Sequence, residues 1–137
     1  MFEEQSAFDV TKAIATLNRI YSYPSPEIKR DFTVSAVDVN TGEYVAMDQT
    51  NTTFENLAQS AMSSASIPVV FPPQSLGSHV FMDGGTVWNL NLDSAVQQCL
   101  NKGFDASDII ADIAICGYNS IPEDALDVEK KAYVNWQ

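Results

Sequence analysis

The chain has 137 residues, 45% of them hydrophobic, which is enough for one domain with a single core and too apolar for a disordered chain. Seven Lys and Arg against 18 Asp and Glu give a formal net charge of −11, which argues against nucleic-acid binding and leaves no basic patch for anionic membranes. No apolar run reaches transmembrane length and the acidic N-terminus lacks a signal-peptide core, so we expect a cytoplasmic protein.

The first third of the chain predicts a helix followed by a hairpin. Apolar residues recur at helical spacing over residues 9–21, and a Pro-containing stretch ends the pattern; they are Val10, Ile14, Leu17 and Tyr21. The β-rich runs 32–39 and 43–48 follow. Gly42 in the three-residue connection between them is a hairpin signal.

A second helix is expected ahead of Pro68, starting at the capping-box pattern Thr52-x-x-Glu55. Its last turns are rich in small residues, namely Ala61, Ser63, Ser64, Ala65 and Ser66. Three of these are serines, but a helix lacks the strained strand-to-helix turn that exposes a nucleophilic serine. Close packing against a neighbouring element explains them better.

The stretch on which the rest depends is Asp83-Gly84-Gly85, directly after the β-prone run 80–82. Functional side chains gather past the carboxyl ends of strands in α/β folds, and a carboxylate there can deprotonate a nucleophile. The glycines would allow a sharp turn with positive φ and a close approach by another segment. Taken alone, the motif is more typical of a strand that ends in a tight turn than of a catalytic site.

The last third predicts a helix, a buried strand and a final helix. Apolar residues line one face of the helix that Gly103 would end; they are Leu92, Ala95, Val96, Cys99 and Leu100. The apolar run 109–116 suits a strand buried on both faces, and Pro122 opens a charged helix. Because strand and helix alternate after residue 79, we expect an α/β layer arrangement with some parallel pairing.

Two blocks together resemble the patatin-like phospholipase family: A-M-S-S-A-S-I-P-V-V-F-P-P over residues 61–73 and F-M-D-G-G-T-V-W-N-L over residues 81–90. The family places a segment like the first shortly before an Asp-Gly-Gly or Asp-Gly-Ala motif, and an Asn usually follows. The resemblance runs from about residue 8 to residue 116. It implies that residues 1–137 are the C-terminal portion of one three-layer α/β/α sandwich that lacks the N-terminal, nucleophile-bearing part.

The resemblance also implies a lipid acyl hydrolase with a Ser-Asp dyad. Asp83 would take the serine proton directly, Gly84 and Gly85 complete its motif, and Asn89 would line the site. No metal or other cofactor is implied. The substrate would be a phospholipid or other acyl lipid, reached by transient contact at a membrane or lipid-droplet surface. No nucleic-acid partner is expected.

The sequence departs from the family at the nucleophile. None of its six glycines frames a serine as Gly-x-Ser-x-Gly, and no glycine-rich oxyanion loop precedes the first helix. One hypothesis is that an upstream or separate segment supplies the serine. The alternative is a non-catalytic fragment or pseudoenzyme that acts as a lipid-binding or interaction module. Because the family's nucleophile strand would lie beside the strand that leads to Asp83, we also expect an uncovered sheet edge there.

Other chemically interesting residues receive plainer interpretations. His79 precedes Asp83 by four residues, which is roughly 13 Å along an extended chain, so the two cannot share a hydrogen bond and His79 is expected at a surface or strand edge. Cys116 ends the predicted strand, but with no His nearby in sequence it is better explained as a buried core thiol. Asp38 and Asp112 lie in β-rich runs and receive no role.

Overall fold

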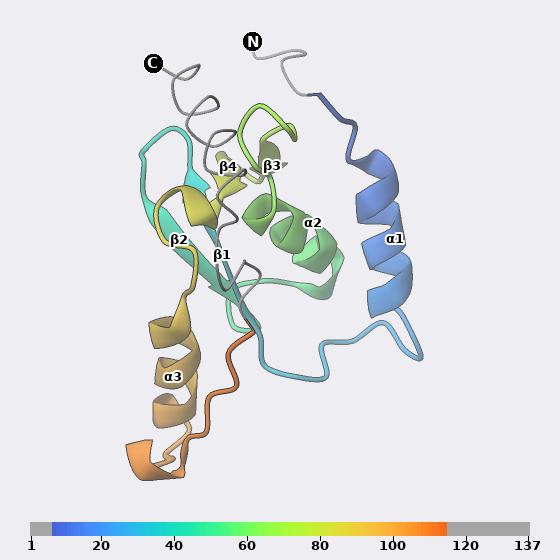
Figure 1. Ribbon diagram of the computed structural model, residues 1–137. Coiled ribbons are helices and arrows are strands. Elements are labelled where there is room, and N and C mark those ends of the chain that lie inside the picture. Colours follow the sequence, from blue (N-terminus) through green and yellow to red (C-terminus); the bar gives the residue numbers. More distant parts are fainter. Residues whose placement is uncertain (1–6, 115–137) are drawn as a thin grey trace, which may run out of the picture.

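A computed structural model describes residues 7–114 as a four-stranded sheet with helices beside it (Figure 1). This confirms the mixed α/β class, the first helix, the hairpin and the helix after the Asp-Gly-Gly motif. The elements in chain order are α1 (Thr11–Tyr21), β1 (Thr33–Asp38), β2 (Tyr44–Asp48), α2 (Phe54–Ser64), β3 (Gln74–Leu76), β4 (His79–Asp83), the 3₁₀ turn η1 (Gly84–Thr86), α3 (Leu92–Asn101) and the 3₁₀ turn η2 (Ala106–Asp108).

The strand order is β2-β1-β4-β3, and every pair in the described range is antiparallel. The expected parallel pairing is therefore wrong there. The reason is β3, which the sequence did not suggest. The chain returns through α2 into β3 and then reverses in a tight turn at Gly77, which has a φ of +62°. Because of this extra reversal, β4 lies next to β1 and runs antiparallel to it.

The uncovered edge expected beside the strand that leads to Asp83 is also wrong within residues 7–114. β4 has β1 on one side and β3 on the other. The outer strands are protected by amide side chains. Asn51 accepts from the Asp48 N–H at 2.8 Å and donates to the Ala46 carbonyl at 3.1 Å, while Gln59 donates to the Ser75 carbonyl at 2.7 Å. Because these side chains already bind backbone N–H and C=O groups of the outer strands, fewer such groups remain free to pair with another strand.

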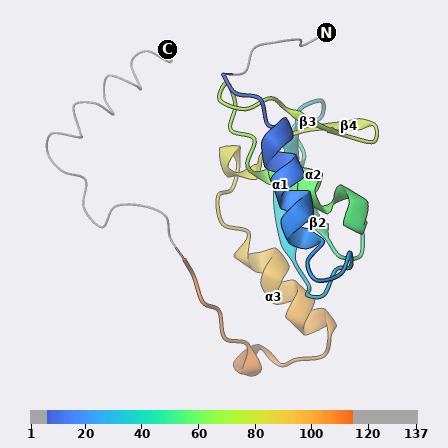
Figure 2. The ribbon, with the colours of Figure 1, turned by 90° about the vertical axis from the view of Figure 1, so that its right-hand side faces the viewer.

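Helices α2 and α1 form successive layers on one side of the sheet (Figures 1 and 2). α2 lies against β1, β3 and β4, and α1 packs on α2. The predicted close packing of small residues is confirmed for Ser63 and Ser66, which are fully buried as Ser60 is, whereas Ala65 is exposed. Two of these hydroxyls bond to carbonyls one turn back, Ser63 to Gln59 at 2.8 Å and Ser66 to Met62 at 2.8 Å. The buried apolar core of the sheet consists of Ala36, Met47 and Phe81.

α3 lies beyond the end of the sheet at which β1 begins (Figure 1). Its Gln98 side chain donates to the Phe32 carbonyl and accepts from Gln49, each at 2.9 Å. Gly103 follows the helix with a φ of +89°, as expected of a C-terminal glycine. None of the helices in the described part of the chain is long and apolar enough to cross a membrane.

The strand expected at 109–116 is wrong over residues 109–114, which form no strand and leave Ile110 almost fully exposed. An apolar run becomes a buried strand only where it finds a partner strand, and within residues 7–114 the four strands of the sheet pair only with one another. Cys116 and the helix expected from Pro122 lie outside the described residues.

Candidate active site around Asp83

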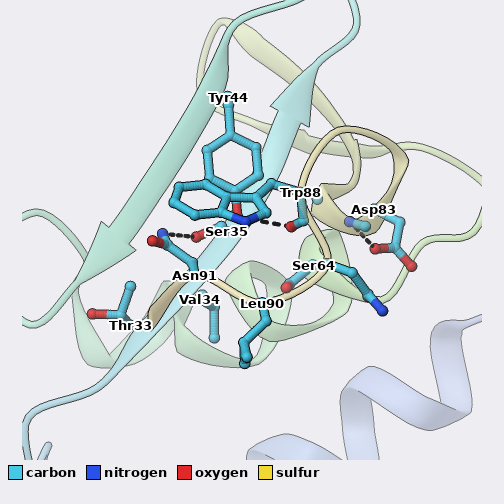
Figure 3. A pocket seen from close by; sticks show the side chains of 12 residues that line it. Thr33, Val34, Ser35, Tyr44, Ser64, Asp83, Trp88, Leu90 and Asn91 are labelled. Carbon is cyan, nitrogen blue, oxygen red and sulfur yellow. Dashed lines mark hydrogen bonds between the residues drawn. The ribbon is translucent and has the colours of Figure 1, made fainter. Parts of the chain in front are cut away.

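A cavity of about 260 Å³ lies beside the carboxyl end of β4 (Figure 3). Its walls come from β1, the start of β2, the last residue of α2 and the turn that follows β4. The residues that line it are Thr33, Val34, Ser35, Tyr44, Ser64, Asp83, Gly84, Gly85, Trp88, Asn89, Leu90 and Asn91. Elements far apart in the sequence thus meet at the predicted motif.

Asp83 is the last residue of β4 and is half-buried. Its backbone N–H donates to the Ser66 carbonyl at 3.0 Å, which fixes the end of β4 against the segment after α2. One carboxylate oxygen, Oδ1, accepts from the Gly85 N–H at 2.7 Å, and the Thr86 hydroxyl donates to the Asp83 carbonyl at 2.7 Å. The other oxygen, Oδ2, makes no hydrogen bond to any residue in 7–114. The carboxylate is oriented by one oxygen and keeps the other for a further partner.

The two glycines after Asp83 have distinct steric roles. Gly84 is buried, and a Cβ there would lie 2.4 Å from the Ser35 carbonyl oxygen, a distance that no real side chain tolerates. A Cβ on Gly85 would meet Asn89 Oδ1 at 2.9 Å and Asp83 Oδ1 at 3.0 Å. The predicted close approach is therefore confirmed, whereas the predicted positive φ is wrong for both glycines. Close packing, rather than an unusual backbone conformation, requires Gly84.

The turn after Asp83 is fastened to β1 and β2 by side chains (Figure 3). The Tyr44 hydroxyl donates to the Trp88 carbonyl at 3.1 Å, and the two rings lie 6.0 Å apart. Asn91 donates to the Ser35 hydroxyl at 2.6 Å. The same Asn91 side chain accepts from the Ser94 N–H at 3.1 Å and so caps α3. These contacts hold the loop that carries the motif.

The residues singled out from the sequence, Asp83, Gly84, Gly85 and Asn89, all line this one cavity. Sequence reasoning missed the contributions of β1 and β2, above all Ser35 and Tyr44. Strand alternation could have placed the β1 side chains on a face, but nothing local in the sequence shows which loop meets that face. Ser64, weighed as a nucleophile, also lines the cavity, but from the last residue of a helix.

His79 and Asp38 form a second polar pair, at the opposite end of β4. His79 Nδ1 lies 2.6 Å from Asp38 Oδ2, and the Asp38 side chain is 4% exposed against 57% for His79. The hydrogen bond from His79 holds the pKa of Asp38 below its usual value, and the Asn40 N–H acts in the same direction. His79 thus serves Asp38 rather than Asp83. No group of three or more His, Cys, Asp or Glu suited to a metal ion occurs in residues 7–114.

Comparison with known proteins agrees with the family resemblance seen in the sequence. The model of a family described as patatin-like phospholipase matches residues 2–96, well over half of the chain. This range contains α1, the sheet, α2 and the complete lining of the cavity, and it ends within α3. No curated protein matches the sequence at a significant level.

Proposed function

Because the chain belongs to the patatin-like phospholipase family, we propose that it supplies the acid of a Ser-Asp dyad to a lipid acyl hydrolase. Asp83 is the general base of this proposal. Residues 1–137 are then the C-terminal portion of the catalytic domain, and an upstream or separate segment carries the serine. The substrate class is a phospholipid or other acyl ester.

The observation that carries the proposal is the state of the Asp83 carboxylate. A general base that works without a histidine relay must be held in a fixed direction and still present a free oxygen to the nucleophile. Oδ1 of Asp83 is bound by the Gly85 N–H at 2.7 Å, while Oδ2 has no partner within residues 7–114. The cavity of about 260 Å³ beside it provides room for the reacting ester.

In acylation, and again in deacylation, Asp83 accepts one proton from the attacking group and then donates it to the leaving group. Asp83 Oδ2 takes the serine proton as the serine oxygen attacks the ester carbonyl, and collapse of the tetrahedral intermediate expels the alcohol, which receives that proton. Water then attacks the acyl-serine by the same route, and the carboxylic acid leaves. Tyr44 and Trp88 line the cavity in positions suited to contact an acyl chain.

A second candidate is a non-catalytic lipid-binding or interaction module. The absence of Gly-x-Ser-x-Gly from the 137 residues favours it, because Asp83 by itself cannot cleave an ester. The two candidates differ in one property. Only the first requires a serine whose reactivity depends on Asp83.

The test is p-nitrophenyl butyrate hydrolysis by the 137-residue chain and by the longest product that its gene encodes. Each is compared with Asp83→Asn and with Asp112→Asn, a matched change at an exposed carboxylate in the irregular segment after η2. We expect no hydrolysis by the 137-residue chain. In a longer product that contains the serine, Asp83→Asn should lower kcat about 10²–10⁴-fold, while Asp112→Asn leaves it unchanged.

Two results would contradict the proposal. Hydrolysis by a longer product that is indifferent to Asp83→Asn would remove Asp83 from the mechanism. No hydrolysis by either product, with no serine labelled by a fluorophosphonate probe, would support the non-catalytic module. Hydrolysis by the 137-residue chain that depends on Asp83 would instead point to a nucleophile within it, and Ser64 would be the first to replace.

A further inference from the structure

The Ser35 side chain forms part of the wall of the cavity and is held there by Asn91 (Figure 3). Ser35 lies on β1 and is only 6% exposed. Its hydroxyl oxygen lies 2.6 Å from the side-chain nitrogen of Asn91, and within residues 7–114 it has no other hydrogen-bond partner. The direction of that one hydrogen bond decides what the hydroxyl proton of Ser35 can bind.

The cap of α3 fixes the direction of this hydrogen bond. A side-chain amide has an acceptor oxygen and a donor nitrogen, and their partners tell the two apart. The Ser94 backbone N–H can only donate and lies 3.1 Å from Asn91 Oδ1, so the amide nitrogen must point to Ser35. Because that nitrogen can only donate, Ser35 Oγ is the acceptor. The Ser35 proton is therefore left for another partner.

Thr33 is held in the same way at a place that solvent reaches. A backbone donor again fixes the direction, because the Phe32 N–H donates to Gln49 Oε1 at 3.1 Å. Gln49 then donates to Gln98 at 2.9 Å, and the Gln98 nitrogen donates to the Thr33 hydroxyl. Thr33 is only half-buried, so water can accept its free proton. The buried Ser35 proton has no such outlet and can find an acceptor only in the cavity.

The lining of the cavity restricts the charge of the acceptor. In the described part of the chain the lining contains no Lys, Arg or His, whereas Asp83 contributes a carboxylate. A phosphate or other anion would be repelled by that carboxylate, with no cation in the lining to offset the repulsion. An uncharged oxygen, such as that of an ester carbonyl or a hydroxyl group, can accept the Ser35 proton without this cost.

We propose that Ser35 selects the substrate of this cavity by donating a hydrogen bond to a carbonyl or hydroxyl oxygen of an uncharged ester rather than to a phosphate. The inference rests on the proposed function and narrows the substrate class of that site to neutral esters. Asn91 is the positioning residue, because it binds the Ser35 oxygen and leaves the proton for the substrate. A ligand without the acceptor leaves a buried donor unpaired and is therefore rejected.

The test is a titration of the isotope-labelled 137-residue chain with glyceryl monobutyrate, an uncharged ester, followed by two-dimensional NMR. We expect saturable shifts of the Ser35, Gly84 and Gly85 amide signals, and weaker binding of glycerol 3-phosphate. Ser35→Ala should lower the affinity for the ester about 2–10-fold, as expected for one hydrogen bond. Ser75→Ala, a matched change at an exposed serine on β3, should bind like the parent. No saturable binding by the parent, or tighter binding of glycerol 3-phosphate, would overturn the proposal.

Asn91→Asp separates substrate binding from a structural role. Its carboxylate keeps the cap on the Ser94 N–H and accepts the Ser35 proton, so the contact with β1 remains while the free donor is lost. We expect parental stability in urea and a loss of affinity as large as in Ser35→Ala. Parental affinity in Asn91→Asp would overturn the proposal, as would losses of stability that accompany the losses of affinity in both variants. The titration needs no chemical step, so a failed general-base role of Asp83 leaves it unchanged, and failed binding leaves the effect of Asp83→Asn on hydrolysis unchanged.

Discussion

Asp38 and Asp83 lie on neighbouring antiparallel strands, and Asp38 pairs across the sheet with Phe81, only two residues from Asp83. Their surroundings differ. The Asp38 carboxylate is buried and both of its oxygens are occupied, one by His79 at 2.6 Å and the other by the Asn40 N–H at 2.9 Å. Asp83 is half-buried, and one of its oxygens has no partner within residues 7–114.

The comparison teaches that a strand-end carboxylate is not chemically available because of its position alone. Asp38 satisfies its hydrogen-bonding capacity within the fold, as a buried acid must, and so stabilises the sheet. Asp83 leaves part of that capacity unused beside a cavity. The proposal for Asp83 depends on this difference, and the difference can be tested at either end of β4.

The largest effect is expected from Gly84→Ala, which alters the end of β4 that carries Asp83 and leaves the Asp38–His79 pair at the other end intact. The new methyl group would lie 2.4 Å from the Ser35 carbonyl oxygen, and neither backbone can move without disturbing β1 or β4. We expect a loss of about 1–3 kcal/mol in the free energy of unfolding, measured by urea denaturation. Gly85→Ala is the control, because the Asn89 side chain that its methyl group would meet can move aside. Equal losses in the two variants would contradict the steric role given to Gly84.

A smaller effect is expected from Asn91→Ala, which releases the turn that carries the motif. The variant loses the cap on the Ser94 N–H and the hydrogen bond to Ser35, and we expect a loss of about 1–2 kcal/mol in the same measurement. Asn91→Ser separates the two contributions. Ser can still cap α3 but is too short to reproduce the contact with Ser35, so it should recover part of the loss. If Ser recovered all of it, the contact with β1 would contribute nothing to stability.

Local features of the fold were predictable from the sequence because their causes are local. The 9–21 helix follows from apolar spacing, and the hairpin follows from Gly42, whose φ of +74° an ordinary residue rarely adopts. The close approach at Gly84 was predictable in kind, since a glycine beside a strand end permits it. Its partner, the Ser35 carbonyl, was not.

The remaining features depend on contacts between distant segments. β3 has three residues and little β-character, and it exists because β4 offers it an edge. The run 109–114 has the apolar pattern of a buried strand but forms none, since pattern alone does not provide a partner. The hydrogen bond between Asn91 and Ser35 joins residues that no local rule connects. The cavity is built from such contacts, which is why only the side of it formed by residues 83–89 was foreseen.

The smallest effect is expected from a change of pH, and it concerns Asp38, which is bound at the end of β4 opposite Asp83. Because the pKa of Asp38 is lower in the folded protein than its ordinary value of 3.8, its contribution to stability is complete above that value and is lost as the pH falls through the lowered folded pKa. The difference in unfolding free energy between the parent and Asp38→Asn should therefore shrink as the pH is lowered from 6 to below 3.8.

The pKa values of Asp9, Asp48 and Glu55 are lowered as well, mainly by hydrogen bonds from nearby Thr hydroxyls or the backbone, but these groups are present in both proteins and cancel in the comparison. His79→Ala removes the largest cause of the shift at Asp38 and keeps the Asn40 N–H, so it should reduce the pH dependence without abolishing it. A difference between the parent and Asp38→Asn that stayed constant over this range would mean that Asp38 is not held by its neighbours. Asp38 would then not be the fully hydrogen-bonded carboxylate with which Asp83 is contrasted.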